Sequence, residues 1–167
     1  MHDVFLGIGS NIGDRIHFLA SAVRKIKTLP STELVKFSSV YETEPVGIRE
    51  QANFLNAALW IQTSIEMKDF HTRTKAIEKE IGRQKSIRWG PREIDIDILL
   101  FADLIIAEPN LRIPHRDMLA RKFVLQPLAE IAPEVIHPTS RISISELLAR
   151  CTDQSAVDRS EELTKIF

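Results

Sequence analysis

The stretch from Ile94 to Phe101 constrains this chain more than any other, because apolar and acidic residues alternate along it. A period of two is typical of a β-strand with one buried face. The apolar members share the face that we expect to be buried, and they are Ile94, Ile96, Ile98 and Leu100. Asp95 and Asp97 then point to the opposite face, about 6.5–7 Å apart. Two carboxylates at this spacing are able to share hard divalent cations.

An ordinary edge strand with solvated acids is the alternative interpretation, since structural charges are common. Aspartate is a poor strand former, however, so two aspartates in one short strand imply a local reason. Arg88, Trp89 and Arg92 stand just upstream, around a Gly-Pro turn. Arginines beside a pair of metal-binding carboxylates suit a phosphate-rich ligand with bound Mg²⁺.

The order of elements along the chain predicts the fold class. Hydrophobic periodicity predicts strands over residues 4–8, 34–42, 54–63 and 94–101, and helices over residues 14–28 and 65–81. This order is the split βαβ arrangement of a ferredoxin-like α+β sandwich of two or three layers, with a central antiparallel sheet and both helices packed on one face. The other face would then be open and carry the site. Residues 83–93 are expected to form a basic loop before the last strand.

Length and charge limit the classes of protein to which the chain can belong. Its 167 residues are consistent with one domain over residues 1–167 with a single core. Short helices are expected within residues 115–133, and the polar residues 152–167 are expected to form a mobile tail. The formal net charge is −1, so no global basic field recruits nucleic acid. No apolar run approaches the length of a membrane span.

Two further features predict the cellular compartment. The N-terminal residues 1–6 lack the basic region and the long apolar run of a signal peptide. Cys151 is the only cysteine, so it cannot form an internal disulfide, and no spacing typical of a zinc site lies near it. We therefore expect a reducing, cytoplasmic setting and a passive Cys151 side chain.

The glycines at positions 7, 9 and 13 are weak motif signals. Their spacing is not that of a dinucleotide-binding loop, and no Gly-Lys-Ser/Thr follows as in a P-loop. A tight turn from strand to helix, with Asp14 capping the helix, is therefore favoured over a loop that cradles phosphate.

Phe54 and Asn56 are expected on one face of the strand over residues 54–63. A buried asparagine offers one acceptor and two donors, which suits the edge of a planar heterocycle, and Phe54 is able to stack on that ring. An ordinary core phenylalanine with a surface amide is the alternative, and it is favoured when these two residues are taken alone. His115 is likewise more often structural when alone, but Arg121 and Phe123 follow within eight residues and are able to touch phosphate and a ring.

Taken together, these motifs resemble those of the hydroxymethyldihydropterin pyrophosphokinase family of folate biosynthesis. The matching blocks follow one another in the expected order, over residues 7–11, 41–47, 54–58, 88–101 and 114–133. The block Arg-Trp-Gly-Pro-Arg-x-x-Asp-x-Asp-Ile is the most specific of them.

The resemblance implies transfer of pyrophosphate from ATP to the hydroxymethyl group of 6-hydroxymethyl-7,8-dihydropterin, with release of AMP. The substrate hydroxyl attacks the β-phosphorus. Two Mg²⁺ ions are implied on Asp95 and Asp97, with Arg83 and Arg92 completing the catalytic set. Such a reaction depends on positioning and charge neutralisation more than on covalent help.

The resemblance also implies where the two substrates bind. The pterin is expected between Phe54 and Phe123, with its edge bound by Asn56 and by backbone groups of Thr43 and Val46. The ATP contacts implied are Glu78, Lys85, Arg88, Trp89, Arg92, Ile98, His115, Arg116 and Arg121. The basic loop over residues 83–93 is expected to close over ATP, and the protein is expected to act as a monomer without nucleic acid or membrane partners.

Three positions depart from the pattern common in the family. Phe54 replaces a common tyrosine, Lys85 stands near a common arginine in a loop that is one residue shorter, and Arg116 replaces a common aromatic. A lysine offers a point charge in place of a bidentate fork. A pterin- or nucleotide-binding module without catalysis and a metal-dependent nuclease are the competing hypotheses. A binding module need not keep Asp95 and Asp97, and the net charge disfavours a nuclease.

Overall fold

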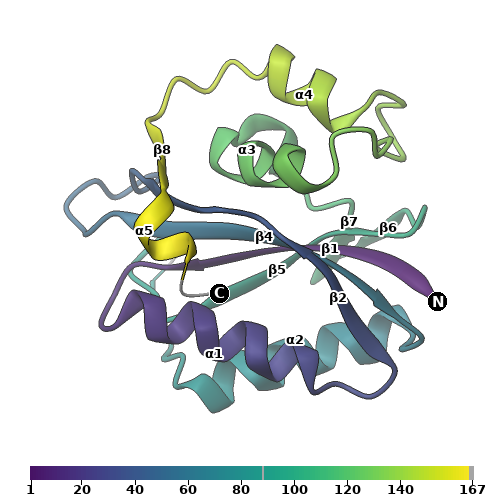
Figure 1. The fold of residues 1–167 in the computed structure, drawn as a ribbon, viewed down its shortest axis with the longest axis horizontal. Helices are drawn as coiled ribbons and strands as arrows, with labels where there is room; N and C mark the ends of the chain where they lie inside the picture. Colours follow the sequence, from purple (N-terminus) through teal and green to yellow (C-terminus); the bar gives the residue numbers. More distant parts are fainter. Residues whose placement is uncertain (88, 166–167) are drawn as a thin grey trace.

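The structure is a computed structural model that describes residues 1–87 and 89–165 (Figure 1). Its elements follow in the order β1 (His2–Ser10), α1 (Arg15–Lys27), β2 (Thr32–Phe37), β3 (Val40–Thr43), β4 (Phe54–Thr63), α2 (Met67–Ile81), β5 (Asp95–Phe101), β6 (Ile106–Glu108), β7 (Leu111–Ile113), a 3-10 turn (Met118–Ala120), α3 (Lys122–Ile131), α4 (Ile144–Arg150), β8 (Val157–Ser160) and α5 (Glu161–Thr164). None of the described helices is long and apolar enough to cross a membrane.

The main sheet has the strand order β5-β1-β4-β3-β8, and β2 pairs with β4 beyond the end of β3. Neighbouring strands are antiparallel throughout. The predicted strand over residues 34–42 is thus two strands, β2 and β3, which share one edge of β4. The first five strands and two helices therefore have the ferredoxin-like arrangement, and the predicted fold class with its central antiparallel sheet is confirmed.

Helices α1 and α2 cover one face of the sheet, as predicted (Figure 1). They pack their apolar stripes on the alternate residues of β1, β4 and β5 that point toward them. The larger side chains buried in this first cluster include Leu6, Ile8, Leu19, Ile26, Leu55, Leu59, Ile61, Phe70, Ile77, Ile94, Ile96 and Ile98. The alternation in β4 and β5 thus placed the core face correctly up to Ile98.

Helices α3 and α4 cover part of the opposite face, which the sequence analysis expected to be open (Figure 1). The buried face of α3 carries Leu125, Leu128 and Ile131, which pack with Phe5 of β1 and Leu100 of β5 in a second cluster. The expectation was wrong because the apolar face of α3 needs a partner, and the sheet supplies one. The molecule has three layers, and the uncovered part of this face is left for the site.

A β-bulge explains why Leu100 lies on the side opposite to the predicted one. In the pairing of β1 with β5, Phe5 stands opposite Leu100 and Leu6 stands opposite Ile98, so Leu99 is an extra residue. One extra residue reverses the alternation beyond it. Leu100 therefore packs under α3, and Phe101 returns to the first cluster.

Of the three glycines near the N-terminus, Gly13 lies in the predicted turn between strand and helix, with φ at 68°, and the other two do not. Strand β1 runs on to Ser10, so Gly7 and Gly9 lie inside the strand, on the face away from α1 and α2. The predicted cap of the following helix is confirmed, because the Asp14 side chain accepts a hydrogen bond from the His17 N–H at 3.0 Å. Because glycine has no side chain, Gly7 and Gly9 leave space on this face of the sheet.

The basic segment lies between α2 and β5. Gly82 ends α2 in the left-handed conformation, with φ at 112°, which a glycine adopts without strain. The described residues from 83 to 94 form neither helix nor strand, so the loop predicted over residues 83–93 is confirmed.

The polar C-terminal segment contributes elements that the sequence analysis did not predict. Residues 157–160 form β8, which pairs with β3, and α5 follows directly. Mobility of residues 152–167 stays a prediction, but β8 belongs to the main sheet.

Helix α3 is joined to β3 by a polar network around Glu130. Its carboxylate accepts hydrogen bonds from the Tyr41 hydroxyl at 2.8 Å, the Ser39 hydroxyl at 2.7 Å and the Ser39 N–H at 3.1 Å. Burial, together with the hydrogen bond to Glu130 and its charge, raises the pKa of Tyr41 to about 12.

We expect Tyr41 to make stability depend on pH between about 10 and 12. Below pH 10 the phenol is neutral in the folded and in the unfolded protein. Above pH 10 the unfolded chain loses the proton first, so the contribution of Tyr41 to the free energy of unfolding is lost as the pH rises through 12. The folded protein should show a tyrosinate absorbance transition with a pKa near 12, and urea-unfolded protein one near 10. Tyr41 is the only tyrosine, so the signal is its own. Tyr41→Phe should cost about 1 kcal/mol at neutral pH and flatten the alkaline loss. A folded-state pKa near 10 would contradict this account.

Candidate active site

A cavity of about 280 Å³ lies on the α3 side of the sheet, over Gly7 and Gly9. Its walls come from β3, β4, β5, the two loops that precede β4 and β5, and the start of α3. Eleven of the predicted site residues line it: Thr43, Val46, Phe54, Asn56, Trp89, Arg92, Asp95, Asp97, His115, Arg121 and Phe123. Side chains from four parts of the sequence thus meet around one space.

Two further hollows adjoin this cavity and contain most of the other predicted residues. One is lined by Ile98 and Arg116 and shares Asp97 and His115 with the cavity. The other is lined by Glu78, Arg83 and Lys85 and shares Arg92 with it. Arg88 is the remaining predicted contact, and it lies outside the described residues.

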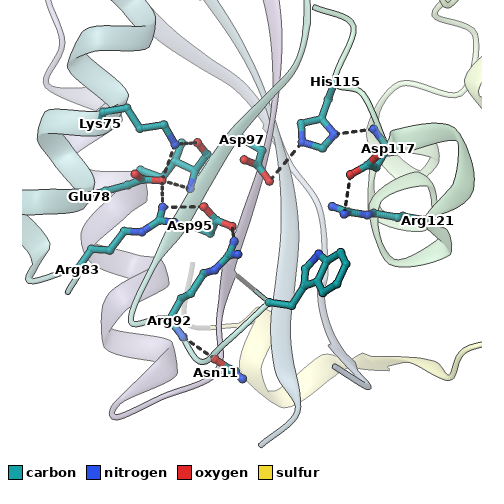
Figure 2. Close-up of polar contacts among 12 residues, drawn as sticks. Asn11, Lys75, Glu78, Arg83, Arg92, Asp95, Asp97, His115, Asp117 and Arg121 are labelled. Carbon is teal, nitrogen blue, oxygen red and sulfur yellow. Dashed lines mark hydrogen bonds and ion pairs between the residues drawn. The ribbon is translucent and has the colours of Figure 1, made fainter. Parts of the chain in front are cut away.

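Asp95 is held by two arginines (Figure 2). Arg83 Nη1 lies 2.7 Å from Asp95 Oδ1, and Arg92 Nη1 pairs with Asp95 Oδ2. Burial alone would raise the pKa of Asp95, but the charges of Arg92, Arg83 and Lys75 outweigh it and hold this pKa below its ordinary value. Asp95 is thus a stable anion with both oxygens engaged.

Asp97 lies in a different environment two residues further on. Its Oδ2 faces His115 Nε2 at 3.9 Å, and burial together with the negative charge of Asp95 raises its pKa above the ordinary value. Among the described residues, no arginine makes an ion pair with Asp97, and Asp95 repels it. A carboxylate pair with one such member favours a bound cation.

Glu78 anchors the Arg83 side chain from α2. Its Oε1 accepts from the Ile96 N–H at 2.7 Å, lies 3.0 Å from Lys75 Nζ and 2.6 Å from Arg83 Nη1. Arg83 therefore bridges Glu78 to Asp95, as Figure 2 shows. The side chain of Glu78 is 4% exposed, so this carboxylate is compensated almost entirely by protein groups.

Asn56 projects from β4 into the cavity. Its Nδ2 donates to Thr43 Oγ1 at 2.7 Å, which fixes the orientation of the amide. A methyl group at Gly9 would stand 2.6 Å from Asn56 Oδ1, so only glycine leaves room for this amide. The same position is 3.7 Å from a ring carbon of Phe54, which places both predicted residues over Gly9.

Arg121 and Phe123 stand across the cavity at the start of α3. The Arg121 guanidinium lies 5.8 Å from the centre of the Phe123 ring and donates to Asp117 Oδ2 at 2.8 Å. His115 Nδ1 accepts from the Asp117 N–H at 3.3 Å, which leaves Nε2 for the side facing Asp97. Asp117 lines the cavity and was not predicted, although its four-residue spacing from Arg121 is a signal for an ion pair.

Two amides join the loops around the cavity, and sequence reasoning also missed them. Asn11 donates from Nδ2 to Gln51 Oε1 at 2.9 Å and accepts from the Arg92 N–H at 2.8 Å. Gln51 donates from Nε2 to the carbonyls of Ile48 at 2.7 Å and Trp89 at 2.8 Å. The loop over residues 44–53 is therefore bonded to the loop over residues 83–93. Asn11 and Gln51 lie 40 positions apart, Gln51 and Trp89 lie 38 apart, and Asn11 and Arg92 lie 81 apart, so no local pattern predicts these bonds.

Comparison of the chain with known proteins finds similarity to one family. The family model described as 7,8-dihydro-6-hydroxymethylpterin-pyrophosphokinase (HPPK) matches residues 5–133. A protein of Aquifex aeolicus (strain VF5) named 2-amino-4-hydroxy-6-hydroxymethyldihydropteridine pyrophosphokinase is 44% identical over 146 residues, 87% of this chain and 90% of that protein. The protein of the same name in Bacillus subtilis (strain 168) is 46% identical over 131 residues, 78% of each.

The fold is also found in a solved structure. The wild-type HPPK-DHPS of Plasmodium falciparum superimposes with a TM-score of 0.70 over 90% of this chain, at 17% identity. The chain spans 43% of the length of that structure. At this identity the likeness concerns the fold alone.

We expect Gln51→Ala to loosen both loops. The substitution removes two hydrogen bonds to backbone carbonyls and one to Asn11, each worth about 1 kcal/mol, so amides in residues 83–93 should exchange with deuterium about tenfold faster or more. Gln62→Ala removes a similar bond to Asp3 and is the matched control, because Gln62 stands at the far end of β4. Unchanged exchange in residues 83–93 for Gln51→Ala would show that the amides do not hold this loop.

Proposed function

Because the chain belongs to the 7,8-dihydro-6-hydroxymethylpterin-pyrophosphokinase family, it transfers pyrophosphate from ATP to 6-hydroxymethyl-7,8-dihydropterin, and we propose that the transfer takes place in the cavity over Gly7 and Gly9. The observation that carries this proposal is the convergence of a carboxylate pair, an oriented amide and several arginines on one space. None of these groups alone specifies a reaction. Together they match a substrate with a flat polar ring and a co-substrate with a charged triphosphate.

We assign the pterin to the part of the cavity next to β3 and β4. Asn56 is oriented by Thr43, so its carbonyl and remaining N–H are available to the edge of a heterocycle. Phe54 lies beside Asn56, and Phe123 lines the same cavity from α3, which supports stacking of the ring between the two phenylalanines. Thr43 and Val46 line the cavity at the end of β3 and in the next loop, where backbone groups meet the same edge.

We assign the triphosphate to the side of β5. Arg92, His115 and Arg121 line the cavity there, and Arg83 reaches the same region through Asp95. Carboxylates of Asp95, Glu78 and Asp117 hold these arginines in place. Binding of ATP then exchanges some of these ion pairs for charge-assisted bonds to phosphate oxygens.

The nucleoside part of ATP fits the hollow lined by Ile98 and Arg116, which opens from the cavity at Asp97 and His115. Lys75 and Arg112 line the same hollow and offer positive charge. Lys85, on the loop over residues 83–93, lines the third hollow with Glu78 and Arg83. Trp89 stands against Gly47, where an added methyl group would lie 3.1 Å from the indole ring, so this loop meets the pterin side of the cavity.

We propose that Asp95 and Asp97 hold Mg²⁺ together with the phosphates of ATP. The described residues contain no group of three or more His, Cys, Asp or Glu side chains arranged to hold a metal ion. A site with two protein carboxylates suits Mg²⁺ that arrives with a nucleotide, because phosphate oxygens and water supply the other ligands. The raised pKa of Asp97 also fits, since a cation relieves its repulsion by Asp95. When bound, the metal would neutralise charge on the transferring phosphates.

The protein groups themselves orient the substrates and stabilise charge. Arg83 and Arg92 are fixed by Asp95, so their positive charges are preorganised where negative charge develops on the pyrophosphate. The Asn56 amide orients the pterin, so that its hydroxymethyl oxygen faces the β-phosphorus. Closure of the loop over residues 83–93 excludes water, which would otherwise compete as the nucleophile.

Three wider properties belong to this proposal. Residues 1–167 act as one pyrophosphokinase domain, and the protein acts as a monomer. It works in the cytoplasm, where the single cysteine stays reduced. Light scattering of the purified protein measures the mass, and a mass of two chains at working concentration would contradict the monomer.

The first experiment is an assay for AMP with purified protein, ATP, Mg²⁺ and hydroxymethyldihydropterin, beside a control without pterin. AMP that depends on pterin, is lost with a chelator and returns with Mg²⁺ is the expected result. ADP in place of AMP would mean transfer of a single phosphoryl group. Pterin binding without turnover would favour a non-catalytic binding module.

Asp95→Asn and Asp97→Asn test the carboxylate pair. Each variant should lose about 100-fold or more in kcat/KM, because charge stabilisation at the phosphates is worth several kcal/mol, while pterin affinity largely survives. Asp103→Asn is the matched control, since Asp103 is exposed in the turn after β5. Full activity with normal metal dependence in either variant would refute the assignment.

A further inference from the structure

The segment over residues 157–164, named here the C-terminal brace, closes the outer edge of β3. Strand β8 pairs antiparallel with β3 over its whole length, from Val40 opposite Ser160 to Thr43 opposite Val157. Figure 1 shows β8 and α5 at this end of the sheet. The brace lies outside residues 5–133, which the family model matches.

Side chains of the brace also hold β3 near its start. Thr164 Oγ1 accepts from the Val40 N–H at 2.9 Å, and Arg159 Nε donates to Ser39 Oγ at 2.7 Å. The Ser39 hydroxyl in turn donates to Glu130 of α3. Arg159 therefore extends the network that joins α3 to β3.

Strand β3 ends at the proposed pterin site. Thr43 is its last residue, and it stands between Phe54 of β4 and Val157 of β8 across the sheet. Thr43 Oγ1 is also the group that orients Asn56. A strand of four residues with a neighbour on one side only is weakly held. The position of Thr43, and through it that of Asn56, therefore depends on pairing at both edges.

We propose that the C-terminal brace positions the pterin-binding wall of the cavity, with Arg159 and Thr164 as positioning residues. The inference rests on the assignment of the pterin to Thr43 and Asn56. The proposed ATP contacts come from α2, β5, the loop over residues 83–93 and the segment between β7 and α3. The side-chain bonds of the brace go to Ser39, Val40 and Glu130 instead, so we expect the brace to act on the pterin and not on ATP.

The test is steady-state kinetics of Arg159→Ala, Thr164→Val and the double variant, with both substrates varied. Each single variant should raise KM for the pterin about three- to tenfold, as expected for one lost hydrogen bond, and leave KM for ATP and kcat within about twofold. The Arg159 side chain is 56% exposed, so its removal leaves no cavity in the core. Deuterium exchange at residues 40–43 should rise in the same variants.

Arg150→Ala and Thr152→Val are the matched controls, because both residues are exposed and precede the brace. If the KM for the pterin in the double variant stays within twofold of the parent value, the proposed role of the brace is refuted. An equal change in both KM values together with a lower Tm would also refute the proposal, because this result would indicate general destabilisation of the fold. Failure of the parent protein to make AMP from ATP and pterin would instead refute the proposed function, so the two failures are distinguishable.

Discussion

The unequal faces of the central strands are the constraint on which the rest of the structure depends. In β1, β4 and β5 one set of alternate residues is large and apolar and packs under α1 and α2. The other set contains Gly7, Gly9, Asn56, Asp95 and Asp97, which cannot form a core. The alternation of side chains thus places the apolar residues in the core on one face and leaves a polar hollow on the other face. Helix α3 covers only the part of this face where apolar residues resume, at Phe5 and Leu100.

The site is built from charges that are already paired before a ligand arrives. Unpaired arginines or carboxylates that are partly buried at the wall of a cavity would be costly. Pairing Arg83 and Arg92 with Asp95, and Arg121 with Asp117, lowers that cost and sets the geometry. In the proposed function, ATP replaces one set of anions by another, so little reorganisation is needed.

Local patterns were sufficient to predict the central strands of the sheet, the two helices on its first face and the strand residues that point into the cavity. The other cavity residues named from the sequence rested on the family resemblance. Alternation along a strand leaves only two faces for a side chain, so the sequence placed Asp95, Asp97, Phe54 and Asn56 on one face. Leu100 was misplaced because a bulge depends on the pairing of β1 with β5, which no single strand reveals. The amides of Asn11 and Gln51 were missed for a similar reason, since their bonds join distant loops. Strand β8 carries a polar sequence, and pairing with β3 gives it order that its own pattern does not predict.

The pairing of β3 with β8 has a consequence for how the chain is made. Val40 and Thr164, which bond to each other, are separated by 124 positions. A ribosome therefore releases β3 long before its outer neighbour exists, and the nascent sheet carries an unpaired edge through most of translation. Contacts of such long range close late, because the loop between them must be ordered first. Until β8 is synthesised, the outer edge of β3 is thus open to pairing with another strand.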